Sequence, residues 1–191
     1  MIRKALLAAF FPIVACAHAP AQDSTPAVET SVDISTPDPS FVKTLPTMGG
    51  DIIGMDGSVI GQMKLTEGPN GLMIEATVQP GGLTPGWHGL HLHQVGDCSD
   101  VGVFKKSGGH MGLIPGGHGL HNPVGPESGD ITNIWAAADG SAGYEVFNTF
   151  ATLADITDED GTAMIIHQNR DDHITQPIGG AGPRVACAVI K

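Results

Sequence analysis

The chain has 191 residues, 41% of them hydrophobic, and a formal net charge of −11. This length accommodates one domain with a substantial core together with a tail. The acidic balance argues against nucleic-acid binding, which needs a basic face, but it is compatible with a small anionic substrate at a locally positive site. High Gly and Pro content, with only 5% aromatic residues, favours short strands and many turns.

Residues 1–16 are typical of an export signal. Arg3-Lys4 precedes an apolar run over residues 5–14, which is too short to span a bilayer. Ile13-Val14-Ala15-Cys16 has the pattern of a lipoprotein processing box, so we expect lipidation of Cys16 and a membrane tether. The alternative is ordinary cleavage at a later small residue, Ala19 or Ala21. Both interpretations predict an exported, periplasmic protein.

Residues 17–46 are rich in Pro, Ser and Thr, and they predict a disordered linker. A single domain follows over residues 47–191. Its short alternating segments predict strands, of which the first two are joined by a turn containing Asn70-Gly71. The expected strands are 58–65, 72–79, 88–94, 131–136, 144–153, 163–168 and 185–190.

Two long stretches, 95–130 and 169–184, lack a helical or strand period. Loops of this length inside a domain are usually functional. Short strands, a hairpin and two long loops together indicate an all-β fold, an antiparallel barrel or sandwich.

The segment around His91 and His93 says most about function. Residues two apart on a strand share a face, so these imidazoles converge while Leu90 and Leu92 turn into the interior. Two neutral imidazoles side by side can supply part of the ligand set of a copper or zinc site. A third candidate, His167, ends an apolar run of strand type.

Three segments carry a family resemblance: Gly-Trp-His-Gly-Leu-His-Leu-His with Gly-Asp-Cys over 86–98, Gly-Thr-Ala-Met-Ile-Ile-His with Asp-Asp over 161–172, and Gly-Pro-Arg-Val-Ala-Cys over 182–187. They resemble copper/zinc superoxide dismutases of the bacterial exported type, in the same order, over roughly residues 47–191. Three matches in register are more specific than one short motif. The resemblance implies a Greek-key antiparallel β-barrel. It also implies conversion of superoxide to dioxygen and hydrogen peroxide, as antioxidant defence in the cell envelope.

The resemblance also implies roles for particular residues. Arg184 falls beside the copper channel, Asp171 falls where the family has a carboxylate linking the two metal sites, and Cys98 and Cys187 fall at the family disulfide. The implied copper ligands are His91, His93, His110 and His167, of which His110 also bridges to zinc and takes part in catalysis. The implied zinc ligands are His110, His118, Asp130 and the residue nine after His118.

That last position holds Glu127, where the family has a histidine. Glu127 can ligate zinc through oxygen. Two other outcomes stay open: the nearby His121 takes its place, or the zinc site is weakened or empty. If the zinc site is weakened or empty, the chain is a copper-only dismutase, or a copper-binding superoxide dismutase-like module with weak or no turnover. The resemblance leaves the choice between a monomer and a homodimer open.

Overall fold

The computed structural model describes residues 44–190. They all belong to one compact unit, Asp38–Lys191. The expected signal segment, Cys16 and nearly all of the expected linker lie outside the described residues. Within the described part, no helix has the length and apolar character needed to cross a membrane.

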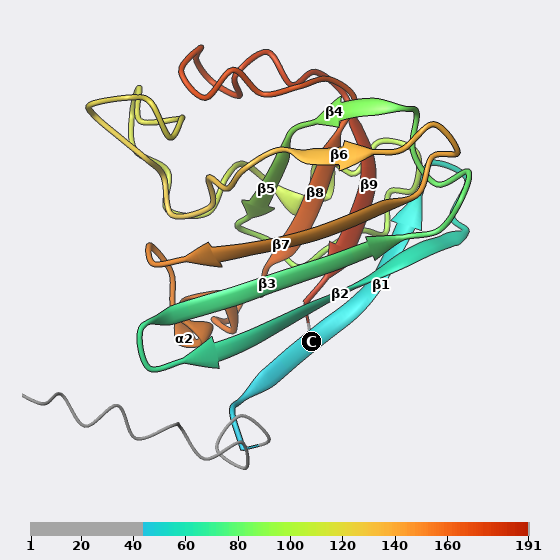
Figure 1. The fold of residues 1–191 in the computed structure, drawn as a ribbon. Coiled ribbons are helices and arrows are strands. Elements are labelled where there is room, and N and C mark those ends of the chain that lie inside the picture. Colours follow the sequence, from blue (N-terminus) through green and yellow to red (C-terminus); the bar gives the residue numbers. More distant parts are fainter. Residues whose placement is uncertain (1–43, 191) are drawn as a thin grey trace, which may run out of the picture. The chain divides into compact units, whose positions relative to one another are not determined.

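The described residues form nine strands in two antiparallel sheets (Figure 1). The large sheet has the order β5-β8-β9-β1-β2-β3-β7, and β4 pairs with β6 in a small second sheet. The bounds are β1 Thr47–Gly54, β2 Val59–Gly68, β3 Gly71–Val78, β4 Gly86–His88, β5 Leu90–His93, β6 Ile134–Ala136, β7 Ala142–Asn148, β8 Ala163–His167 and β9 Arg184–Val189.

The large sheet curls into a half-barrel around an apolar core (Figure 1). Alternation along β3 shows which face meets the core: Leu72, Ile74 and Ala76 are buried, whereas Glu75 and Thr77 face outward. Leu90 and Leu92 of β5 reach the same core, as predicted. The prediction of an all-β antiparallel barrel or sandwich is therefore confirmed.

Three elements differ from the sequence-based expectation. Strand β1 was not predicted, because Gly49-Gly50 interrupts its alternation; a Cβ on Gly50 would lie 2.1 Å from the Val189 carbonyl oxygen of the neighbouring strand. The expected strand 88–94 is divided at Gly89, whose N–H bonds to Asn169 instead of a strand partner.

The third difference follows β7, which ends at Asn148 rather than at residue 153. A short helix, α2 (Leu153–Ile156), occupies the expected end of that strand. Thr152 and Asp155 form a capping box that satisfies the free N–H groups of the first turn. Local capping therefore overrides the alternating pattern.

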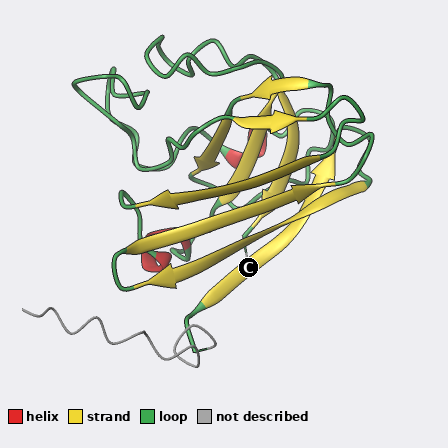
Figure 2. Cartoon of the chain, in the orientation of Figure 1, coloured by secondary structure: helices red, strands yellow, loops and turns green. Residues whose placement is uncertain are grey.

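The two long loops lie against each other and contain little regular structure (Figure 2). The His118 N–H donates to the Gln176 side chain, and the Gln176 amide donates back to the His118 carbonyl. A disulfide joins Cys98, at the start of the first loop, to Cys187 in β9, which confirms the predicted pairing. The first loop also holds a 3-10 turn, η1 (Lys105–Ser107).

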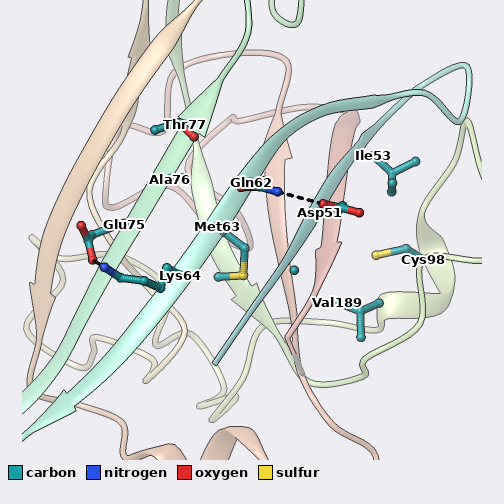
Figure 3. Close-up of a pocket in the computed structure, with 11 residues that line it drawn as sticks. Asp51, Ile53, Gln62, Met63, Lys64, Glu75, Ala76, Thr77, Cys98 and Val189 are labelled. Atoms are coloured by element: carbon teal, nitrogen blue, oxygen red, sulfur yellow. Dashed lines mark hydrogen bonds and ion pairs between the residues drawn. The ribbon is translucent and has the colours of Figure 1, made fainter. Parts of the chain in front are cut away.

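A groove of about 750 Å³ runs over the outer face of β1, β2 and β3 (Figure 3). Lys64 and Glu75 form an ion pair of 2.5 Å on this face. Asp51 and Gln62 also line the groove, and no histidine does. This groove is therefore separate from the histidine clusters.

Candidate metal centre

Four buried histidines form one cluster, with ligand atoms within 4.8 Å of one another. Strand β5 presents His91 and His93 on one face, as predicted from their spacing. His167 ends the neighbouring strand β8, and a bridge to His93 places His110 of the long loop beside them. The sheet therefore positions three of the four imidazoles directly.

Each ring in this cluster has one nitrogen bonded to protein and one that is not. The bonded nitrogens are His91 Nε2 to Asp171, His93 Nδ1 to the Gly108 carbonyl, His110 Nδ1 to Glu127 and His167 Nδ1 to the Gly182 carbonyl. The other nitrogens, His91 Nδ1 and Nε2 of His93, His110 and His167, are buried without a hydrogen-bond partner. Buried polar atoms are almost always paired, so four orphaned imidazole nitrogens facing one another fit a copper ion.

Burial of the four-histidine cluster also favours the neutral form of its imidazoles. Burial lowers the pKa of His91 to about 4 and that of His167 to about 3. Burial, followed by the electrostatic effect of the neighbouring His110 and Arg184, holds the pKa of His93 well below its usual value. Neutral rings are the form that binds a metal, so near neutral pH these three require no deprotonation.

A second cluster lies on the other side of His110. Its members are His110, His118, Glu127 and Asp130, all buried, with ligand atoms again within 4.8 Å of one another. His118 Nδ1 is 2.8 Å from Asp130 Oδ1, and His110 Nδ1 is 3.2 Å from the same oxygen. Two imidazoles and two carboxylates form a donor set that suits zinc.

Glu127, rather than His121, completes this cluster. Its Oε2 lies 2.9 Å from His110 Nδ1, and its Oε1 accepts from the Ile114 N–H at 3.1 Å. His121 is exposed and packs against His173, with ring centroids 5.7 Å apart. Of the two residues considered for this position, the structure therefore places only Glu127 at the cluster.

Asp171 connects the two clusters. Its Oδ2 is 2.7 Å from His91 Nε2, and its Oδ1 is 3.2 Å from His118 Nε2. Such a carboxylate determines which nitrogen of each ring faces the metal. The resemblance implied this link, and the geometry is consistent with it.

Two further residues, which the sequence does not point to, support Asp171. Asn133 bonds to the backbone of Asp171 on both sides, at 2.8 Å to its N–H and 2.9 Å to its carbonyl. Gly179 has a φ of 61°, and a Cβ there would fall 1.5 Å from the Asp171 carboxylate. A lone Asn and one Gly within a glycine-rich loop carry no sequence signal for these contacts.

In the second cluster, unlike the first, a histidine and the aspartates bonded to it have pKa values shifted in opposite directions. Burial opposes charge on His118, but hydrogen bonds to Asp130 and Asp171 outweigh it and raise its pKa to about 9. Burial likewise acts against ionisation of the two aspartates, but their bonds to histidines leave the pKa of each well below its usual value. This cluster therefore holds a proton on His118, whereas the low pKa values of His91, His93 and His167 leave those three rings of the first cluster neutral.

Arg184 stands at the opening above the first cluster. It begins β9, directly opposite His167 in the register with β8. Its guanidinium donates to the Phe104 carbonyl at 2.5 Å, to Ser107 Oγ at 3.0 Å and to the Gly108 carbonyl at 2.6 Å. It shares a cavity of about 430 Å³ with His93, His110 and His167. A fixed cation thus faces the copper-type cluster.

Comparisons with known proteins agree with this geometry. The family model of copper/zinc superoxide dismutase (SODC) matches residues 59–190. The chain is 45% identical over 150 residues to a Cu-Zn superoxide dismutase of Caulobacter vibrioides, covering 71% of this chain and 80% of the relative.

Solved structures show the same fold. A superoxide dismutase-like protein from Bacillus subtilis superposes with a TM-score of 0.66 at 30% identity, covering 74% of this chain and 97% of that one. The Cu/Zn superoxide dismutase of Brucella abortus gives a TM-score of 0.63 at 27% identity, covering 76% and 100%. With the family model matched over most of the described domain, the chain belongs to the copper/zinc superoxide dismutase family.

Proposed function

We propose that this protein converts superoxide to dioxygen and hydrogen peroxide at a copper centre held by His91, His93, His110 and His167. The observation that carries the proposal is the set of four buried, unpartnered ring nitrogens that face one another. When bound, copper supplies a one-electron couple that takes an electron from one superoxide and gives it to the next.

The protein's own groups bind the substrate and handle its protons. Arg184 attracts the anion and orients it beside the ring nitrogens, because its guanidinium is fixed by three hydrogen bonds. Two superoxide ions and two protons yield one dioxygen and one hydrogen peroxide. His110 lines the cavity, so its Nε2, when it is not bound to the metal, can hold one of these protons and pass it to the product.

The second cluster binds zinc in this proposal, through His110, His118, Glu127 and Asp130. Its two carboxylates make it harder and more anionic than a site with three imidazoles. Asp171 holds the rings of His91 and His118 in the orientation that both sites need. The zinc site thereby stabilises the loop that carries His110.

Metal content and superoxide-dependent turnover, measured together on the purified protein, test the proposal. We expect one copper and one zinc per chain and turnover that is lost on chelation and regained with copper. Arg184→Gln should lower the rate at low salt and flatten its salt dependence, and Lys64→Gln, in the separate groove over β1, β2 and β3, is the control cation. A fully copper-loaded protein without turnover would instead support a copper-binding module, and copper without zinc would support a copper-only dismutase.

For location, we propose an exported protein tethered to the membrane through lipidated Cys16. Arg3-Lys4 and the apolar run 5–14 support export, and the disulfide between Cys98 and Cys187 suits an oxidising compartment. The intact mass of protein extracted from membranes should show acyl chains on Cys16, and Cys16→Ser should release the protein from the membrane fraction. A mass that corresponds to cleavage after Ala19 or Ala21 would contradict the tether.

For assembly, we propose a homodimer that forms through the small sheet. Trp87 of β4 and Trp135 of β6 are 45% and 52% exposed, with ring centroids 5.1 Å apart, and Arg170 stacks on Trp87. Trp and Arg are the residues most enriched at the centres of interfaces. Sedimentation equilibrium should give a dimer that Trp135→Ser dissociates, whereas Phe147→Ser, an equally exposed aromatic in β7, should not. A wild-type monomer would contradict this proposal.

A further inference from the structure

The cavity above the four-histidine cluster has apolar walls that an oxygen anion does not require. Met55, Val103 and Leu113 line it, although their side chains are 47%, 48% and 60% exposed. Ile178 from the second long loop lines it as well. Exposed apolar side chains that gather around one opening mark a surface for an apolar ligand.

The charged side chains in the same cavity favour binding of an anion. Its lining includes two cations, Lys105 and Arg184, and no carboxylate. The chain as a whole has a net charge of −11, so this cavity is a local exception to the acidic balance. A guanidinium has five N–H donors, and three hydrogen bonds to protein leave two of those of Arg184 for a ligand.

We propose that this cavity binds a free medium-chain carboxylate. The carboxylate lies at Arg184 and Lys105, and the alkyl chain lies along Met55, Val103 and Leu113. A planar guanidinium binds a carboxylate through two parallel N–H···O bonds, which fix the orientation of the anion. A volume of about 430 Å³ is in the range of pockets that enclose one small ligand.

The proposed ligand competes with superoxide, because both use Arg184. The site goes beyond the proposed dismutase activity and does not depend on it. Binding can be measured by calorimetry on the copper-loaded protein and, separately, on the metal-free protein. Failure of turnover would therefore leave this proposal testable, and failure of carboxylate binding would leave the dismutase assignment intact.

The experiment titrates acetate, butyrate, hexanoate and octanoate into the purified protein. Each added methylene should tighten binding roughly threefold, because it transfers apolar surface out of water. Octanol and octylamine share the chain but lack the anion, so neither should bind measurably. In methyl-labelled protein, the resonances of Met55, Val103 and Leu113 should move with octanoate.

Leu113→Ser should weaken octanoate binding roughly fivefold and reduce the dependence on chain length. The matched control is Val124→Ser, because Val124 is also 60% exposed but lies outside the cavity lining. The proposal is wrong if affinity does not rise with chain length, if octanol binds as tightly as octanoate, or if Leu113→Ser and Val124→Ser behave alike. Binding to anionic phospholipid vesicles without binding to free octanoate would also overturn it.

Discussion

The two histidine clusters share His110 and are connected by Asp171, but they are built in different ways. The first is made of imidazoles alone, three of them on adjacent strands, with one nitrogen of each ring unpaired. The second lies on the long loops, and its imidazoles already bond to its own carboxylates. The first cluster therefore presents unpaired ring nitrogens to a metal, whereas the rings of the second cluster are partly satisfied by hydrogen bonds to its own carboxylates.

This difference predicts that each site can be damaged separately. His167→Gln removes an imidazole that belongs only to the first cluster. Loss of a residue that only hydrogen-bonds to a metal ligand typically costs about 10–100-fold, so loss of a ligand should lower copper affinity by about 100-fold or more. Zinc affinity should stay unchanged. Competition with a chelator measures both. His121→Gln, at an exposed histidine outside both clusters, is the control, and an equal loss of both metals in His167→Gln would mean that the clusters are not separable.

Asp171→Asn should affect both sites, because Asp171 orients a ring in each. The amide cannot accept from both histidines as the carboxylate does, so copper and zinc affinity should each fall about 10–100-fold. Asp172→Asn is the matched control, since Asp172 is exposed and bonds within its own turn, to Ile174 and Thr175. If copper affinity alone fell, the link to His118 would have no energetic role.

Glu127→Gln changes only the second cluster and keeps the size of the side chain. The amide can still accept from the Ile114 N–H, but it lacks the charge that a zinc ligand supplies. Zinc affinity should fall about tenfold, and copper affinity should not change. Glu145→Gln, on the outer face of β7, serves as the control. Unchanged zinc affinity in Glu127→Gln would remove Glu127 from the ligand set.

The same contrast explains what the sequence could predict. The spacing of His91 and His93 predicted their shared face because strand geometry converts a separation of two residues directly into direction. Positions on loops have no such rule. The choice between Glu127 and His121 stayed open in the sequence, and the contacts of Asn133 and Gly179 with Asp171 depend on how two distant loops meet.

The smallest predicted effect is a difference in proton release on metal binding. The pKa of His118 is raised to about 9, so this ring is protonated near neutral pH and must lose a proton to accept a metal at Nδ1. Burial keeps the pKa of His91 at about 4 and that of His167 at about 3, so these rings are already neutral. Zinc added alone to the metal-free protein should therefore release about one proton more than copper added alone.

Calorimetry in buffers of different ionisation enthalpy measures these protons directly. Because protons compete with zinc at His118, zinc affinity should rise with pH and level off above about 9, where the ring is already neutral. Copper affinity should rise less steeply over the same range. Equal proton release for the two metals would mean that His118 does not carry its proton in the metal-free protein, and the electrostatic contrast between the clusters would be lost.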